Sequence, residues 1–318
     1  MSDTTASLRR KIEGARDLRA VVSTMKALAA ASIGQYEKSV HALDGYYRAV
    51  QLGLSVCFRT SGSAAAVAGQ KKDVGITGAV VFGSDQGLVG QFNDVVADYA
   101  VQTLAALPGK KKIWAVGERV HDRLALTGMP LAGLLTVPLS IRAITPLVGQ
   151  ILFQMLVPEQ VDGDVQWKRE GTNEMSQLYL FYNSSRAGAV YAPVHQRLLP
   201  LDAAWRRDLA SLPWPTKNLP EVIGGSPATL QALVREYLFV SLFRACAESL
   251  ASENASRLAA MERAEKNIDQ LSTDLHHMFY RLRQSKIDEE LFDVISGVEA
   301  LAGAEQARRP VDSGDGWD

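Results

Sequence analysis

The chain has 318 residues, which is enough for two domains or for one domain with long extensions. With 47% hydrophobic and 22% charged residues it can bury a core, which excludes a collagen, a small disulfide scaffold and a globally disordered chain. The 34 basic and 35 acidic side chains give a net charge of −1, so overall charge offers no attraction to nucleic acid or anionic lipid. Cys57 and Cys246 lie outside any CxxC motif, and we expect them to be reduced core thiols of a cytosolic protein.

The chain shows no segment suited to a membrane. Residues 1–11 lack the apolar run of a signal peptide, and no stretch approaches 18 consecutive apolar residues. We therefore expect any work at a membrane to go through a partner protein.

The N-terminal residues show the periodicity of a long helix. Apolar or small side chains recur at alternating steps of three and four residues from Leu8 to Leu54, which is the pattern of a narrow coiled-coil seam. Gly14, Gly34 and Gly45 each weaken an isolated helix by about 1 kcal/mol relative to alanine. We predict a coiled-coil helix over residues 1–59 that depends on a packed partner.

The C-terminal residues predict a second long helix over residues 226–303. Ser226 is a suitable N-cap, Pro227 suits the first helical position, and residues 228–296 contain neither glycine nor proline. Apolar residues keep heptad spacing in two series, and the five-residue step from Leu282 to Ile287 shifts the seam between them. The first series is Ile268, Leu271, Leu275, Met278 and Leu282, and the second is Ile287, Leu291, Val294, Val298 and Leu301. We expect residues 304–318 to be disordered.

The middle of the chain, residues 73–200, predicts a small α/β domain with partly parallel strands. The expected strands are 76–82, 113–116, 177–182 and 189–199, and the expected helices are 93–107, 118–126 and 146–157. By composition, residues 60–72 and 201–225 are linkers.

A glycine-rich turn follows the first of these strands. Gly83 to Gly90 stands between a strand and a helix, where phosphate-binding loops occur. Its spacing is neither GxGxxG nor a P-loop, because Gln91 stands where GK[ST] would follow. We favour a structural turn over a nucleotide site.

No catalytic or metal-binding pattern is evident. The five histidines form no HExxH motif or ligand cluster, and the adjacent His276 and His277 point about 100° apart on a helix. No GxSxG is present, and neither cysteine has a histidine near it in sequence. We expect no catalytic residue, no cofactor and no metal site in this chain.

Several stretches resemble the gamma subunit family of the F-type rotary ATP synthase. Residues 8–12 (LRRKI) and 23–31 (STMKALAAA) are similar to two of its N-terminal stretches, and residues 84–90 (SDQGLVG) are similar to a loop of its central domain. The C-terminal residues 252–261 (SENASRLAAM) and 283–301 carry the most specific similarity.

The sequence also departs from the family pattern. Gln86 and Val89 replace an arginine and a cysteine in the loop, and Asp288 replaces a threonine. These departures indicate a divergent branch, such as an alternative ion-translocating ATPase.

The resemblance implies a fold and a set of partners. The terminal helices would form an antiparallel coiled coil, a rotor shaft inside a hexamer of alpha and beta subunits. The α/β domain, Rossmann-like in type, would sit against the membrane ring of c subunits and an epsilon subunit. The chain would then be a non-catalytic subunit, peripheral to the cytoplasmic face of a bacterial plasma membrane, and would contact no nucleic acid.

The resemblance also implies site residues. It places Met25, Lys26, Arg283 and Gln284 near the beta subunits. It assigns Ser84, Asp85, Gly87 and Gly90 to the loop of the foot domain.

The residues by themselves do not exclude two other functions. One is a nucleotide-binding Rossmann-like enzyme that uses the loop at residues 83–90. The other is a coiled-coil scaffold unrelated to ATP.

Overall fold

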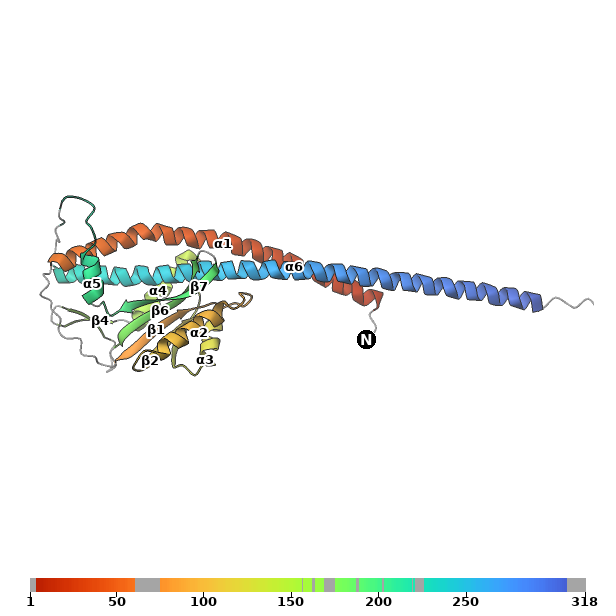
Figure 1. The fold of residues 1–318 in the computed structure, drawn as a ribbon, viewed down its shortest axis with the longest axis horizontal. Coiled ribbons are helices and arrows are strands. Elements are labelled where there is room, and N and C mark those ends of the chain that lie inside the picture. The colour runs from red at the N-terminus through yellow and green to blue at the C-terminus, as the bar shows by residue number, and fades with distance from the viewer. Residues whose placement is uncertain are drawn as a thin grey trace, which may run out of the picture. The chain divides into compact units, whose positions relative to one another are not determined.

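The computed structural model describes residues 4–60, 75–155, 157–161, 164–168, 175–186, 189–201, 203–218, 220 and 226–307. The chain forms two compact units, a smaller one of Met1–Thr24 with Glu262–Asp318 and a larger one of Met25–Met261. The long helices α1 (Thr5–Thr60) and α6 (Ser226–Ala307) contribute residues to both units. The predicted fold class is confirmed: the two terminal helices pack together, and a sheet domain lies between them in sequence (Figure 1).

In the smaller unit, α1 and α6 run antiparallel. The Arg19 guanidinium lies 2.7 Å from a carboxylate oxygen of Asp269, and the Arg9 guanidinium lies 5.4 Å from the centre of the Phe279 ring. In the same part of the helix pair, the side chains of Leu8, Ala15 and Leu275 are buried together. The apolar seam predicted from heptad spacing therefore holds the helices together here.

Part of the predicted seam is wrong. Leu275 is 7% exposed, but Leu271, four residues away, is 49% exposed, and Met278 is also exposed. The helix has 3.6 residues per turn, so a strict seven-residue series drifts around it, and only the members facing α1 are covered.

The second heptad series, from Ile287 onward, is exposed as well. On the register set by the two polar pairs, the start of α1 at Thr5 lies opposite α6 at about residue 283. In Figure 1, α6 continues past the N-terminal end of α1. The apolar residues of this segment that the structure shows exposed are Ile287, Leu291, Phe292, Val294, Ile295 and Val298.

In the larger unit, α1 and α6 are again antiparallel neighbours. The Tyr46 hydroxyl donates a hydrogen bond to Glu236 at 2.7 Å, and the rings of Tyr47 and Tyr237 lie 5.9 Å apart. A Cβ atom at Gly53 would come within 3.0 Å of the Leu233 side chain, so this glycine allows close approach of the helices.

The larger unit also contains a five-stranded mixed sheet in the order β3-β2-β1-β6-β7. The strands β1 (Ile76–Phe82), β2 (Lys111–Val116), β3 (Leu131–Leu135) and β6 (Met175–Arg186) are parallel, and β7 (Ala189–Leu199) runs antiparallel to β6. All seven residues of β1 are buried. Burial on both faces explains why β1 reads as a continuous apolar run in the sequence.

Helices cover both faces of the sheet. The helices α2 (Phe92–Ala105) and α3 (Glu118–Ala125) pack on one face (Figure 1). The helix α4 (Ile141–Met155) packs on the other face, together with parts of α1 and α6. The larger apolar core lies on this second face, so the sheet domain and the helix pair share one core.

Several elements differ from the sequence prediction. The helix α4 begins at Ile141, not at Pro146, because its buried stripe of Ile144, Leu147, Val148 and Ile151 outweighs the backbone hydrogen bond that Pro146 removes. The sequence does not predict the strand β3. This strand lies at the sheet edge, and its five residues are too few for a clear alternation of exposed and covered side chains.

The stretch 201–225 is not only a linker, since it contains α5 (Ala203–Ala210). An antiparallel hairpin of β4 (Val157–Val161) and β5 (Asp164–Lys168) was also not predicted. The helix α6 continues to Ala307, four residues past the predicted end. The predicted linker residues 61–72 and the tail from residue 308 lie outside the described residues.

The corrected seam predicts which leucine stabilises the helix pair. Leu275→Ala should reduce the free energy of unfolding of the smaller unit by about 2–3 kcal/mol, because a buried leucine leaves a cavity. The matched variant Leu271→Ala, at an exposed position of the same helix, should change it by less than about 1 kcal/mol. Hydrogen exchange of the α1 amides in residues 5–24 measures both, and equal effects would contradict the assigned seam.

Candidate functional site

The loop that follows β1 is closed by its own side chains. The backbone N–H of Ser84 donates to Oδ1 of Asn93 at 2.9 Å, and Nδ2 of Asn93 donates to the Ser84 hydroxyl at 2.8 Å. Both residues are buried. The pair holds the loop against the start of α2.

Asp85 ties the same loop to two other elements. Its Oδ1 accepts the backbone N–H of Glu118 at the start of α3, and its Oδ2 accepts the backbone N–H of Val137, each at 3.0 Å. Gly117 stands beside this contact with φ 115°, and a Cβ atom there would lie 2.8 Å from the Ser84 backbone. The close approach therefore requires glycine.

The loop geometry favours a structural turn over a phosphate site. Phosphate binding at such a loop uses free backbone N–H groups, but those of Ser84 and Glu118 are already bonded to side chains of the protein. A Cβ atom added at Gly87 would make only an ordinary contact, 3.9 Å from Nη2 of Arg119, and Gly90 adopts φ 58°. All four loop residues proposed from the sequence thus lie in one turn.

A polar face of α6 lies against this loop. Ser249, Ser252, Glu253 and Ser256 are buried and share one side of the helix, as their spacing of three and four residues requires. The Ser256 hydroxyl donates to the carbonyl oxygen of Val89 at 2.5 Å. The family-like stretches 84–90 and 252–261 therefore meet inside the protein.

Glu253 and Arg257 form the charged part of this face. Nη2 of Arg257 donates to Oε1 of Glu253 at 2.6 Å, and the two side chains are 12% and 7% exposed. Burial raises the pKa of the Glu253 carboxyl above its ordinary value, the Arg257 charge opposes that rise, and Asp85 adds to it. The charge and the hydrogen bond of Arg257 thus stabilise the ionised form of Glu253 in a poorly solvated position.

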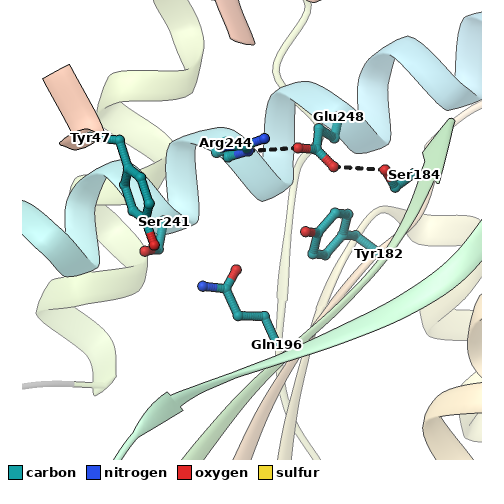
Figure 2. Close-up of a pocket in the computed structure, with 7 residues that line it drawn as sticks. All are labelled: Tyr47, Tyr182, Ser184, Gln196, Ser241, Arg244 and Glu248. Atoms are coloured by element: carbon teal, nitrogen blue, oxygen red, sulfur yellow. Dashed lines mark hydrogen bonds and ion pairs between the residues drawn. The ribbon is translucent and has the colours of Figure 1, made fainter. Parts of the chain in front are cut away.

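A second polar cluster joins the sheet to both long helices. The Ser184 hydroxyl on β6 donates to Oε2 of Glu248 at 2.8 Å, and Nε of Arg244 donates to Oε1 of the same carboxylate at 2.8 Å. Nη1 of Arg244 also donates to Oδ1 of Asp44 on α1 at 3.2 Å. Figure 2 shows Ser184, Glu248 and Arg244 in this series.

Ser184, Arg244 and Glu248 line a pocket of about 380 Å³. Its other lining residues are Tyr47, Tyr182, Gln196 and Ser241, and Figure 2 shows them around the same space. Burial, with a contribution from Glu248, raises the pKa of Tyr182 to about 12. The phenol is therefore protonated at neutral pH, and the charged groups of the pocket are bonded to each other.

The two cysteines are buried thiols with raised pKa values, caused by burial at both positions. Raised thiol pKa values make both poor nucleophiles at neutral pH. Within the described ranges, no three His, Cys, Asp or Glu side chains are grouped so that they could hold a metal ion. In the same parts of the chain, no helix is long and apolar enough to cross a membrane.

The four partner-contact residues proposed from the sequence are divided between the units. Met25 and Lys26 are half-buried on α1 in the larger unit. Arg283 and Gln284 are exposed on α6 in the smaller unit, where Nε2 of Gln284 donates to Oδ1 of Asp288 at 3.0 Å. Sequence reasoning missed the Ser184–Glu248–Arg244 cluster, although the i, i+4 spacing of Arg244 and Glu248 was a readable signal.

Comparison with known proteins gives one consistent result. The family model described as ATP synthase matches residues 4–301. The "ATP synthase gamma chain" of Brevibacillus brevis is 28% identical over 303 residues, covering 93% of this chain and 98% of the relative. The protein of the same name from Nitratidesulfovibrio vulgaris (strain Hildenborough) is 25% identical, covering 92% of this chain and 97% of the relative.

Solved structures show the same fold. A chain of the Euglena gracilis mitochondrial ATP synthase (OSCP/F1/c-ring) superposes with a TM-score of 0.62 at 17% identity, covering 98% of this chain and 99% of that one. A chain from the central stalk and c-ring of the Tetrahymena thermophila enzyme gives a TM-score of 0.53 at 21% identity, covering 77% of this chain and 99% of that one.

The Glu253–Arg257 pair predicts a pH-dependent stability. The carboxyl pKa of Glu253 is lower in the unfolded state than in the folded state, so the unfolded state releases the proton first as pH rises. The free energy of unfolding therefore falls as pH rises through the raised pKa of the folded state. Glu253→Gln removes this ionisation and keeps an oxygen for Arg257, so wild type should lose stability relative to this variant between pH 5 and pH 8. Glu253→Ala leaves Arg257 without its carboxylate and should cost about 3 kcal/mol.

Urea denaturation of the full chain at both pH values measures these differences. A difference between wild type and Glu253→Gln that does not change with pH would contradict the assigned pKa shift.

Proposed function

The chain belongs to the ATP synthase gamma chain family, and from this premise we propose what each part of it does. It is the non-catalytic rotor subunit in the central stalk of an F-type ATP synthase. The family match over residues 4–301 carries this conclusion, because it includes both long helices and the sheet domain. The rotor couples ion flow through a membrane ring to changes of nucleotide affinity in the catalytic beta subunits.

The helices of the smaller unit form the part of the shaft that alpha and beta subunits surround. The support is a set of large apolar side chains that stay exposed there, where a partner would cover them. On α1 they include Leu18 and Val21, and on α6 they include Leu291, Phe292 and Val298.

The sheet domain forms the foot of the rotor, against the ring of c subunits and an epsilon subunit. Leu126, Leu139 and Phe153 on this domain are each at least 80% exposed, and a partner that surrounds the domain would cover them. The chain would thus be peripheral to the cytoplasmic face of a bacterial plasma membrane and held there by its partners.

Coupling then requires no active site in this chain. The two helices differ in sequence around their circumference, so rotation presents different side chains to each of three beta subunits in turn. Each tenfold change of nucleotide affinity corresponds to about 1.4 kcal/mol, which a few such contacts can supply.

The nucleotide-enzyme alternative is less well supported. The loop that would bind phosphate uses its Ser84 N–H and its Asp85 carboxylate for contacts within the chain. A scaffold unrelated to ATP would leave the family match unexplained.

Purification of the native complex tests the proposal. The tagged full chain, expressed in its own cell, should bring down alpha and beta subunits and give ATP hydrolysis that the isolated chain lacks. The chain with a deletion of residues 284–307 should recover less of them, because the exposed apolar segment of α6 is lost. Recovery of the chain without any ATPase subunit would contradict the rotor function.

The partner residues make a separate prediction. Arg283→Ala with Gln284→Ala should lower the turnover of the assembled complex and leave the melting temperature of the free chain unchanged, because both side chains are exposed on α6. Arginine donates a rigid fork of hydrogen bonds, so its loss removes a charge-assisted contact. Met25→Lys should impair coupling more than assembly.

The control is Arg235→Ala, an exposed arginine on the part of α6 that belongs to the larger unit. Ion pumping per ATP hydrolysed in reconstituted complexes is the measurement. Unchanged rates and ratios in the double variant would show that Arg283 and Gln284 are only solvated.

A further inference from the structure

Two hydroxyl hydrogen bonds connect the sheet domain to α6. Ser184 on β6 donates to Glu248 at 2.8 Å, and Ser256 on α6 donates to the Val89 carbonyl at 2.5 Å. The two bonded positions on α6 are eight residues apart, which is about 12 Å along the helix axis. The sheet domain is therefore fastened to this helix at two separate points.

The first of these bonds continues to α1. Glu248 accepts Nε of Arg244, and Nη1 of Arg244 donates to Asp44 on α1. One series of polar contacts thus runs from the sheet through α6 to α1, as Figure 2 shows for its first three residues.

Apolar contacts between the sheet and the helices accompany these bonds. Leu178 and Leu180 on the sheet share a core with Leu238 and Leu242 on α6. Apolar burial gives cohesion in proportion to the area removed from water and has no preferred direction. Hydrogen bonds need a defined distance and angle, and two of them along one axis fix both translation and rotation.

We propose that the Ser184–Glu248 and Ser256–Val89 bonds form a torque joint, which keeps the sheet domain from slipping on the helix pair when the rotor turns under load. The proposal rests on the rotor function above, in which torque passes between the foot and the shaft in either direction. Glu248 and Arg244, which line the pocket, are already bonded to each other, so the pocket belongs to this joint.

The double variant Ser184→Ala/Ser256→Ala tests the joint, because it removes both bonds and keeps the Arg244–Glu248 pair. The control Ser39→Ala/Ser211→Ala also removes two serine hydroxyl bonds, but each of these lies within one local segment, to the Tyr36 and Asp208 carbonyls. Rescue variants are Ser184→Thr and Ser256→Thr, which retain the hydroxyl.

Two measurements on the assembled complex separate torque from folding. The first is ATP hydrolysis by the soluble catalytic hexamer with the variant chain, which does not load the foot. The second is ATP-driven uptake of protons or sodium ions per ATP in membrane vesicles, against an imposed gradient.

We expect soluble hydrolysis and melting temperature to stay close to wild type. We expect ion uptake per ATP under load to fall below that of the wild type, because loss of two hydrogen bonds raises the slipped population about tenfold. The threonine variants should restore uptake, and the control should match wild type.

Wild-type uptake in the double variant would overturn the joint, and so would a loss of soluble hydrolysis or of assembly equal to the loss of uptake. The single variant Ser184→Ala applies the same criteria with a smaller perturbation. Failure of the wild-type chain to assemble with the catalytic subunits would instead overturn the rotor function itself.

Discussion

The antiparallel pairing of α1 with α6 is the contact on which the other features depend. An 82-residue helix cannot bury its own apolar side chains, and Leu275 is buried only because Leu8 and Ala15 lie beside it. In the larger unit, the same two helices present one apolar surface to the sheet, and Val50, Leu54 and Leu242 enter a common core with it. Beyond the N-terminal end of α1, the apolar residues of α6 are exposed.

The polar residues of the larger unit show a second principle. Burying Glu253 is unfavourable for its charged form, and the cost is offset by one arginine on the same helix. Ser256 donates its hydrogen bond to a backbone carbonyl of another element, and Asp85 accepts one from a backbone N–H of another element. Residues with the chemistry of a binding site thus serve to hold elements together, which is consistent with a subunit that transmits motion and leaves nucleotide chemistry to others.

The stretches that resemble the gamma family most closely are of two kinds. Residues 84–90 and 252–261 meet inside the larger unit, where Ser256 bonds to Val89, so internal packing accounts for them. Arg283 and Gln284 are exposed on α6, so packing within the chain gives no reason for them. The contact with beta subunits proposed above would account for their similarity to the family.

The sequence by itself determined the two long helices, the strands β1, β2, β6 and β7, and the family. These features rest on local periodicity, on continuous apolar runs and on specific residue patterns, all of which are properties of neighbouring residues. Only the tertiary structure decided which heptad residues are covered, because Leu275 and Leu271 look alike in sequence and differ in whether α1 lies opposite. It also decided the start of α4 ahead of Pro146, and it brought Ser184 to Glu248 and Val89 to Ser256. Those pairings join residues that are far apart in the chain. Their energies depend on burial and on distances in space, and neither can be read from neighbouring residues in the sequence.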